Sequence, residues 1–264
     1  MRIGVTGISG KMGRTIANLV KQDDVAQLSA ALTRESSGVS GQDLGEFLGF
    51  DKNNVVITSS VDDFLNGCDA VIDFTSPKNS LNIAKKCAQH KKVLVCGTTG
   101  FSEEEKVEFS SNSKDTVMIW SSNMSLGVNL LMNLSEEVSK ILRDDFDVEI
   151  VEMHHRHKVD APSGTALSLG AAVAAGRNID LKENANMARV GKDAQRIKGE
   201  IGFATLRGGD VVGDHSVIFA GDGERVELTH KASNRDVFAK GAIRAAIWGS
   251  IQDPGFYSMR DVLK

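Results

Sequence analysis

Three of the chain's six histidines lie within four positions of one another, in the segment EMHHRHK at residues 152–158. Arg156 and Lys158 add two fixed positive charges to the same stretch. A cluster of imidazoles and cations can ligate a metal, contact a nucleic acid, or bind an anionic substrate and donate a proton to it. The residue types around the cluster distinguish these three kinds of chemistry.

A metal site has little support around the cluster. Arg156 and Lys158 disfavour a third positive charge beside them, and the sequence contains no H-E-x-x-H motif. Glu152 and Asp160 are the obvious neighbouring residues that could supply a carboxylate ligand. A metal hydrolase that uses the histidines is therefore an alternative hypothesis, as is a structural role in which the imidazoles are hydrogen-bonded within a loop.

The residues that follow the cluster favour an anionic ligand. Pro162, Ser163 and Thr165 predict that an Ala-rich helix begins here, and the first backbone N–H groups of that helix, at Gly164 and Thr165, can bind a carboxylate. Cationic groups just upstream complete a pocket for a small polycarboxylate: His154, His155, Arg156, His157 and Lys158. We expect a histidine of this pocket to transfer a proton near neutral pH.

A glycine-rich turn near the N-terminus predicts a dinucleotide site. In the stretch IGVTGISGKMGR, at residues 3–14, Gly7, Gly10 and Gly13 follow a predicted strand and open a predicted helix. Glycines let backbone N–H groups approach a pyrophosphate, and the positive end of the helix dipole lies behind them. The spacing is G-x-x-G-x-x-G and not the usual G-x-G-x-x-G, so its position at the first strand of an α/β half strengthens the interpretation.

The end of the second predicted strand, Leu32-Thr33-Arg34-Glu35, indicates which nucleotide is bound. An acidic residue here would bind the ribose 2′-OH of NAD, whereas an arginine accommodates the 2′-phosphate of NADP. Thr33 carries no charge that would repel a phosphate, and Arg34 can pair with one. We therefore expect NADPH to be preferred and NADH to be tolerated, since Glu35 could restore NAD binding.

Two further loops follow predicted strands at the same edge, CGTTG at residues 96–100 and SSNM at residues 121–124. Ligands of doubly wound folds bind at the carboxyl ends of the strands, so small polar residues there could hold a nicotinamide carboxamide. A hydride carrier, an anion pocket and a proton donor together are typical of a reductase that acts on an unsaturated dicarboxylic acid.

Strands and helices alternate through the first half of the chain, separated by short glycine-containing loops. This alternation predicts a parallel, doubly wound α/β sheet. Strands are predicted at residues 2–6, 27–32, 69–74, 92–96 and 116–120, and helices at residues 11–21 and 79–89 and from residue 102.

The second half has a different pattern. Helices are predicted at residues 126–143, 166–175 and 235–250, and residues 147–153 alternate polar and apolar side chains as a half-exposed strand does. Glycine turns separate β-prone runs between residues 201 and 231, which predicts antiparallel strands. We infer two domains joined by short hinges.

Composition excludes several classes of protein. The 264 residues are 41% hydrophobic and 25% charged, which suffices for a core without disulfides or a structural metal. The net charge of -4 disfavours non-specific binding of nucleic acid. Cys68, Cys87 and Cys96 have no metal-binding spacing and are expected to be reduced core thiols. We expect a soluble, cytoplasmic protein without membrane partners, since no signal peptide and no apolar run of about 20 residues is present.

Several segments together closely resemble the 4-hydroxy-tetrahydrodipicolinate reductase (dihydrodipicolinate reductase) family of bacterial lysine and diaminopimelate biosynthesis. They extend nearly from end to end of the chain: the glycine turn, VIDFTSP, VCGTTGF, SSNMSLGVN, EMHHRHKVDAPSGTA, IGFATLRGGDVVGDHSV and MRDVL. The EMHHRHKVDAPSGTA block is long and highly specific to that family. The resemblance implies a Rossmann-type dinucleotide-binding domain at residues 1–125, completed by residues 235–264. It also implies an α+β domain with a mixed sheet at residues 126–234, which binds substrate and builds a homotetramer.

The resemblance also implies roles for individual residues. Hydride from the nicotinamide would go to C4 of the unsaturated ring that forms as water leaves the 4-hydroxy substrate. His154 would be the general acid that protonates the neighbouring carbon, and Lys158 would be a second proton donor and an anchor for the developing charge. His155, Gly164 and Thr165 would hold the substrate carboxylates.

The cofactor residues that the resemblance implies lie in the loops described above. They are Gly7, Ile8, Ser9, Gly10, Lys11, Met12, Arg34, Gly97, Thr98, Thr99, Ser121, Ser122, Asn123 and Met124. Family members often have Glu or Asp at the position of Thr33, so its absence agrees with a preference for NADPH, and Lys11 stands where many members have Arg. No metal is implied. A regulator that senses NADP without chemistry is a further alternative, although it would not need a pair of proton donors.

Overall fold

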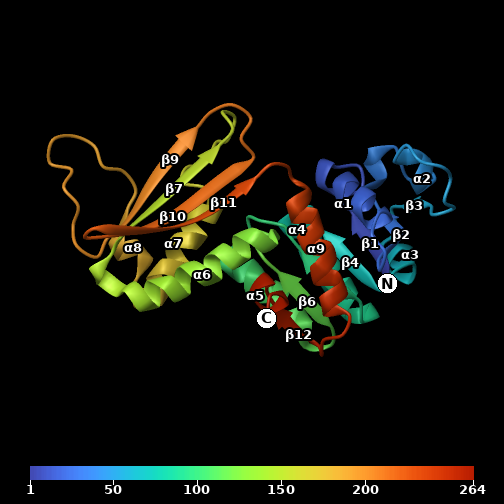
Figure 1. The fold of residues 1–264 in the computed structure, drawn as a ribbon. Coiled ribbons are helices and arrows are strands. Elements are labelled where there is room, and N and C mark those ends of the chain that lie inside the picture. The colour runs from blue at the N-terminus through green and yellow to red at the C-terminus, as the bar shows by residue number, and fades with distance from the viewer. The chain divides into compact units, whose positions relative to one another are not determined.

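The computed structural model describes residues 1–264, and the chain divides into two compact units (Figure 1). Unit 1 comprises Met1–Leu126 together with Asp236–Lys264, and unit 2 comprises Gly127–Arg235. Each unit has its own sheet and its own buried apolar residues. None of the helices combines the length and the apolar composition that a bilayer-crossing segment needs.

The sheet of unit 1 has seven strands in the order β12-β6-β5-β4-β1-β2-β3, and every neighbouring pair is parallel. The predicted doubly wound, Rossmann-type sheet is confirmed. The strand order reverses between β4 and β1, which is the switch point where ligands of such folds bind. The strands are β1 (Arg2–Thr6), β2 (Gln27–Leu32), β3 (Ile57–Thr58), β4 (Ala70–Asp73), β5 (Val93–Cys96), β6 (Val117–Trp120) and β12 (Gly255–Tyr257).

Helices cover both faces of this sheet, because successive strand side chains point to opposite faces. Val5 and Ile72 pack in one apolar cluster with α1 and α9, whereas Val71 and Leu94 pack in a second cluster with α3, α4 and α5. The helices of unit 1 are α1 (Lys11–Lys21), α2 (Leu44–Phe47), α3 (Val61–Asn66), α4 (Pro77–His90), α5 (Glu103–Ser111), α9 (Asp236–Gly249) and α10 (Met259–Val262).

Helix α1 begins directly after the glycine turn and spans the residues that were predicted. Its buried residues, Gly13, Ile16, Ala17 and Val20, recur at helical spacing and form one face. That face anchors the helix on the sheet, so the N-terminus of α1 is held at the carboxyl end of β1.

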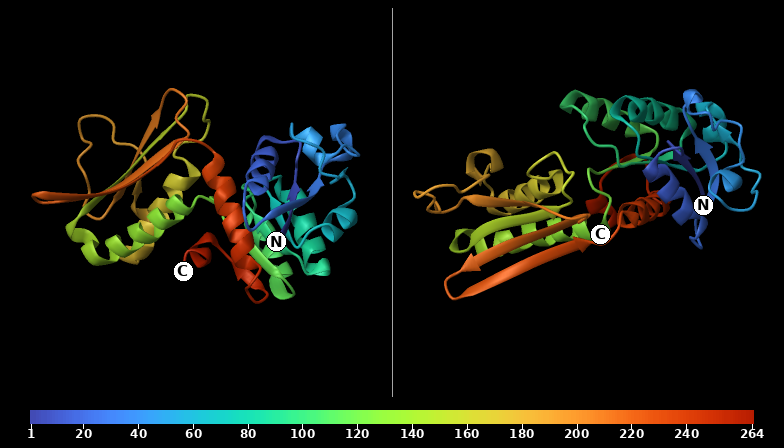
Figure 2. Two further views of the ribbon diagram at one scale, coloured as in Figure 1. Left: turned by 45° about the vertical axis from the view of Figure 1, so that its right-hand side comes forward. Right: turned by 90° about the horizontal axis from the view of Figure 1, so that it is seen from above.

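Unit 2 contains a five-stranded mixed sheet in the order β11-β10-β7-β9-β8, with α6 and α7 packed over one face (Figure 1). The strands are β7 (Asp147–His154), β8 (Ala185–Asn186), β9 (Ile201–Arg207), β10 (Gly213–Gly221) and β11 (Glu224–Ala232). The helices are α6 (Leu126–Leu142), α7 (Gly164–Arg177) and α8 (Leu181–Asn184). The β10–β11 hairpin forms a long ribbon, and the β8–β9 connection is a long loop that extends away from the strands (Figure 2).

The prediction that residues 201–231 form only antiparallel strands is wrong for β9. Strand β9 is parallel to both β7 and β8, whereas β10 is antiparallel to β7 and β11. The chain between β7 and β9 includes α7, and a crossover of this kind returns the chain in the same direction. Of the two glycine turns, only the one at Asp222 and Gly223 closes a hairpin, because β9 and β10 are not neighbours in the sheet.

Candidate active site

The histidine cluster begins at the last residue of β7. Across the sheet, His154 is in register with Arg207 of β9, and Glu152 is in register with His215 of β10. Ser163, which precedes α7, caps that helix by accepting the N–H of Ala166 at 3.1 Å. One place in unit 2 therefore receives side chains from the ends of β7 and β9, from the beginning of β10 and from the N-terminus of α7.

Glu152 is the centre of this arrangement. Its side chain is only 1% exposed and accepts hydrogen bonds from Arg207 at 2.8 and 3.0 Å and from the Ser163 N–H at 3.0 Å. Glu152 Oε2 also lies 2.6 Å from His154 Nδ1. Burial raises the pKa of Glu152, but the hydrogen bonds from Arg207, His154 and Ser163 outweigh burial and hold that pKa below its ordinary value. Glu152 is therefore a buried carboxylate near neutral pH.

The contact with Glu152 fixes the orientation of His154, whose side chain is 10% exposed. A carboxylate favours a proton on Nδ1, so Nε2 is the atom that can deliver a proton elsewhere. A Cβ atom at Gly213 would lie 3.0 Å from His154 Nε2. The absence of a side chain at this position keeps space open beside Nε2.

His215 lies between His154 and the serine that precedes helix α7. It is 4% exposed, its ring centroid lies 5.0 Å from that of His154, and its Nε2 lies 3.0 Å from Ser163 Oγ. Burial, followed by the positive charge of His154, lowers the pKa of His215 to about 4. His215 is thus neutral near pH 7 and supports the serine that caps α7.

The pKa of His215 predicts a pH dependence of stability. Below about pH 6.5, unfolded chains bind a proton that folded His215 does not, so stability falls as pH decreases from about 6.5 to about 4. We expect this group to lower the free energy of unfolding by about 2 kcal/mol between pH 7 and pH 5. Urea unfolding at pH 7 and at pH 5 measures this decrease in the free energy of unfolding. The decrease should be smaller in His215→Gln than in wild type by about 2 kcal/mol.

The exposed His157 offers a matched control for this measurement. His157→Gln retains His215 and should therefore keep the pH-dependent loss of stability that His215 causes. His230, whose pKa burial also lowers, is present in all three proteins. An identical loss in wild type and His215→Gln would contradict the prediction.

The remaining predicted substrate residues lie between β7 and the first turn of α7. Lys158 Nζ donates to Asp160 Oδ1 at 2.9 Å, and this hydrogen bond is the main reason why the pKa of Asp160 is lowered. The charge of Lys158 is also a minor contribution to the lowered pKa of His215. Gly164 and Thr165 open α7, and a Cβ at Gly164 would meet no atom within 4 Å. The helix N-terminus therefore has open space at its first residue.

The sequence pattern indicated Glu152 only as a possible metal ligand and did not indicate Arg207 or His215. The two-residue spacing of Glu152 and His154 on a strand was a usable signal, because it places both side chains on one face. Arg207 and His215 gave no such signal, since their contacts depend on strand order. No group of three or more His, Cys, Asp or Glu side chains is arranged to hold a metal ion.

The glycine turn of unit 1 has the geometry that a pyrophosphate requires. Gly7 has a φ of +62°, and a Cβ at Gly13 would lie 2.3 Å from the Gly7 carbonyl oxygen. Helix α1 has no acidic residue in its first turn and no side-chain cap at Gly10. No side chain of the helix therefore occupies the N–H groups at its start, and the turn fits a dinucleotide.

The other predicted cofactor residues follow β2, β5 and β6 at the same edge of the sheet. Arg34 is exposed, and the buried Thr33 donates through Oγ1 to Ser37 Oγ at 2.7 Å. Ser37 was not predicted, because a serine in a polar loop has no distinctive pattern. Ile8 and Met124 are buried in the apolar core, so only their backbone atoms could contact a nucleotide. The other residues of these loops are Gly97, Thr98, Thr99, Ser121, Ser122 and Asn123.

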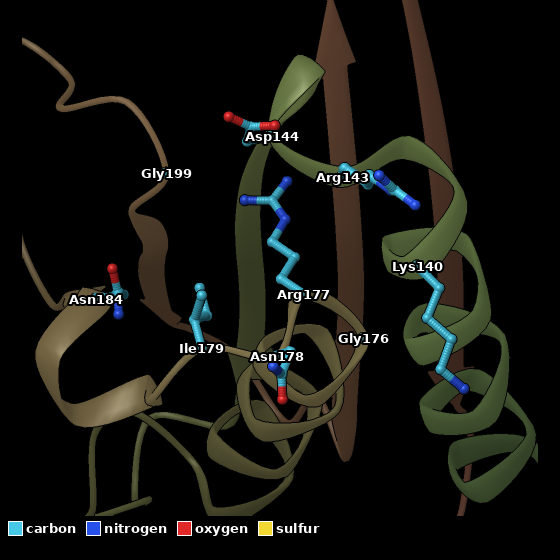
Figure 3. A pocket seen from close by; sticks show the side chains of 9 residues that line it. All are labelled: Lys140, Arg143, Asp144, Gly176, Arg177, Asn178, Ile179, Asn184 and Gly199. Atoms are coloured by element: carbon cyan, nitrogen blue, oxygen red, sulfur yellow. The ribbon is translucent and has the colours of Figure 1, made fainter.

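A separate cavity of about 640 Å³ in unit 2 involves none of these residues (Figure 3). Figure 3 shows the guanidinium of Arg177 extending toward Asp144. Asp144 pairs with Lys198, and Lys140 pairs with Glu137. Arg177 donates to the Phe146 carbonyl, but its Nε and Nη1 are buried without a hydrogen-bond partner. We assign no chemistry to this cavity, which is lined by Lys140, Arg143, Asp144, Gly176, Arg177, Asn178, Ile179, Asn184 and Gly199.

Comparisons with known proteins cover the whole chain. Residues 1–124 match the family model described as dihydrodipicolinate reductase, N-terminus, and residues 127–263 match that of dihydrodipicolinate reductase, C-terminus. Among solved structures, the fold is similar to that of a dipicolinate-bound dihydrodipicolinate reductase from Paenisporosarcina sp. TG-14. That comparison has a TM-score of 0.78 at 24% identity and covers 100% of this chain and 99% of the other.

Two dehydrogenases share the fold at lower similarity. An amine dehydrogenase from Mycobacterium smegmatis has a TM-score of 0.64 at 13% identity, with 98% of this chain and 95% of the other covered. A probable dehydrogenase from Thermotoga maritima has a TM-score of 0.61 at 15% identity, with 100% and 92% covered. Both likenesses concern the fold alone.

Proposed function

Because the chain belongs to the dihydrodipicolinate reductase family, we propose that His154, Lys158 and the first turn of α7 act on its substrate. The protein is an NAD(P)H-dependent oxidoreductase. It reduces 4-hydroxy-tetrahydrodipicolinate (dihydrodipicolinate) to tetrahydrodipicolinate in the biosynthesis of lysine and diaminopimelate.

The assignment of His154 as the general acid rests on the 2.6 Å contact between Glu152 Oε2 and His154 Nδ1. In its protonated form, His154 holds one proton on Nδ1 toward Glu152 and a second on Nε2. Transfer of the Nε2 proton to a substrate carbon leaves a neutral imidazole that still donates to Glu152. Arg207 offsets the charge of the buried Glu152 and keeps the carboxylate in place.

The substrate carboxylates are proposed to bind at the start of α7. The N–H groups of Gly164 and Thr165 lie at the positive end of the helix dipole, and this end favours anions. His155 and Lys158 would add hydrogen bonds and positive charge from the preceding loop. The similar Paenisporosarcina reductase was solved with dipicolinate, a dicarboxylate, which supports this class of ligand.

The residues around the glycine turn would hold the nicotinamide cofactor. When bound, NAD(P)H supplies the hydride that reduces C4 of the substrate ring. The backbone between Gly7 and Met12 would bind the pyrophosphate, and the loops at residues 97–99 and 121–124 would hold the nicotinamide end. Arg34 and the Ser37 hydroxyl, which accepts from Thr33, would bind a 2′-phosphate, and this favours NADPH while NADH is tolerated.

Replacing Arg34 should change which nucleotide is preferred. Hydrogen bonds to a charged group contribute about 1.5–3 kcal/mol, so Arg34→Ala should lower the ratio of kcat/KM for NADPH to that for NADH by about 10- to 100-fold. Steady-state kinetics with both nucleotides provide the measurement. Lys21→Ala, at the far end of α1 where Lys21 lies over the Phe50 ring, serves as a control and should leave the ratio unchanged. A wild-type ratio below one would refute the preference for NADPH.

The reaction is tested by following NADPH oxidation with the product of dihydrodipicolinate synthase as substrate. Rapid, substrate-dependent oxidation is expected. Binding of NADPH without oxidation would favour a sensor of NADP. Stoichiometric zinc together with activity that a chelator abolishes would favour a metal hydrolase.

We propose further that unit 2 builds a homotetramer through its mixed sheet. Strand β7 buries alternate residues against α7, and the residues between them, including Val151 and Met153, remain partly exposed on the opposite face. A partly apolar sheet face of this kind can pair with another copy. Light scattering that gives the mass of a single chain would reject this assembly.

A further inference from the structure

Asp73 is a buried acidic residue for which the proposed function provides no role. It is the last residue of β4 and is 0% exposed. Thr75 Oγ1 donates to its carboxylate at 2.7 Å and Thr98 Oγ1 at 3.4 Å. The hydroxyls of Thr6 and Ser80 donate to it as well. These donors are neutral, so the hydrogen bonds stabilise a negative charge without cancelling it.

The four hydroxyls come from three segments at the switch point of the sheet. Thr6 ends β1 directly before the glycine turn, Thr75 and Ser80 follow β4, and Thr98 follows β5. The segments also contact one another, because Thr98 Oγ1 accepts the Thr75 N–H at 3.0 Å. One carboxylate thereby holds together the loops after β1, β4 and β5, two of which we assign to the cofactor.

We propose that Asp73 is a positioning residue of the nucleotide site, and that its negative charge favours the oxidised over the reduced nucleotide. The proposal rests on the proposed cofactor site at this edge of unit 1. Hydride donation converts a neutral dihydronicotinamide ring into a positively charged one. A fixed negative charge under the carboxyl ends of β1, β4 and β5 would stabilise the charged ring, and burial keeps that attraction from being screened by water.

The size of the effect follows from Coulomb's law. In a site with an effective dielectric constant of about 20, removing one of two attracting unit charges can change an equilibrium constant by roughly tenfold. Asp73→Asn should therefore raise the ratio of the dissociation constant of NADP⁺ to that of NADPH by about tenfold. Titration calorimetry with each nucleotide, without substrate, measures this ratio directly.

Thr98→Val provides the matched control, because it removes one hydroxyl donor and keeps the charge. If Asp73 acts through both position and charge, Thr98→Val should weaken binding of both nucleotides and leave their ratio within about twofold of wild type. A loss that is equal for both nucleotides in Asp73→Asn would overturn the role of the charge.

The outcomes separate this proposal from the assignment on which it rests. Wild-type protein that binds neither nucleotide would overturn the cofactor site and this inference with it. If the wild-type protein binds both nucleotides and Asp73→Asn binds both with unchanged affinity, only the inference is overturned. Should Asp73→Asn not fold, Thr6→Val tests the positioning role. We expect it to bind both nucleotides about two- to tenfold more weakly, and unaltered binding would refute that role.

Discussion

Replacing His154 with glutamine is expected to lower kcat by about 10²–10⁴-fold, the usual contribution of a general acid. Glutamine can still hydrogen-bond to the buried Glu152 but cannot deliver a proton to carbon. Because His154 is not one of the residues proposed to bind the nucleotide, binding of NADPH in the absence of substrate should be unaffected. Stopped-flow or steady-state measurement of NADPH oxidation, together with calorimetric titration of NADPH, gives both quantities.

His157→Gln is the matched control for this prediction. His157 is an exposed histidine of the cationic pocket expected from the sequence, but the proposed reaction needs it neither for proton transfer nor to bind a substrate carboxylate. Its replacement should leave kcat within about twofold of wild type. If His154→Gln also retained activity within about twofold, His154 would be removed from the mechanism and the contact with Glu152 would be structural.

Removing the charge of Lys158 is expected to have an effect of similar size. Lys158→Met should lower kcat/KM by about 10²–10³-fold, as removal of a preorganised donor to developing charge does. The loss should appear in both kcat and KM, because Lys158 is proposed to donate a proton and to anchor the anionic substrate. Initial rates over a range of substrate concentrations at saturating NADPH separate these two parameters.

Asp160 supplies the control for Lys158. The two side chains are hydrogen-bonded at 2.9 Å, so Lys158→Met leaves Asp160 without this partner. Asp160→Asn removes the carboxylate and keeps the amine, and we expect a change of less than about tenfold. A larger loss in Asp160→Asn than in Lys158→Met would assign the effect to the loop conformation and contradict the role of the amine.

The positions of most elements could be predicted because their patterns are local. Strand β1 and helix α1 have the predicted bounds, since the helical spacing of Ile16 and Val20 and the glycines before the helix are contained in a short stretch. The start of α7 was indicated by Pro162 and Ser163, and the structure places Ser163 at the cap. The two-residue β3 and three-residue β12 were not predicted, because strands this short have no recognisable alternation.

The direction of β9 shows the limit of local patterns. Its residues favour a strand, but no feature of the sequence states which neighbour the strand will have. The glycines after β9 suggested a hairpin with β10, whereas β7 lies between these two strands. Pairing depends on how α7 and the connection through α8 return the chain to the sheet, and that is decided by packing across the whole unit.

The sequence by itself determined which chemical groups are present and where helices begin: the imidazoles of His154, His155 and His157, the amine of Lys158, the N-terminus of α7 and the glycine turn. Tertiary structure alone decided what surrounds them. The hydrogen bonds between Glu152 and Arg207, between Ser163 and His215, and between Asp73 and Thr98 form only because strands distant in sequence are neighbours in a sheet. The physical reason is that helix starts and strand periodicity arise from neighbouring residues, whereas hydrogen-bond partners and pKa values arise from burial and strand order.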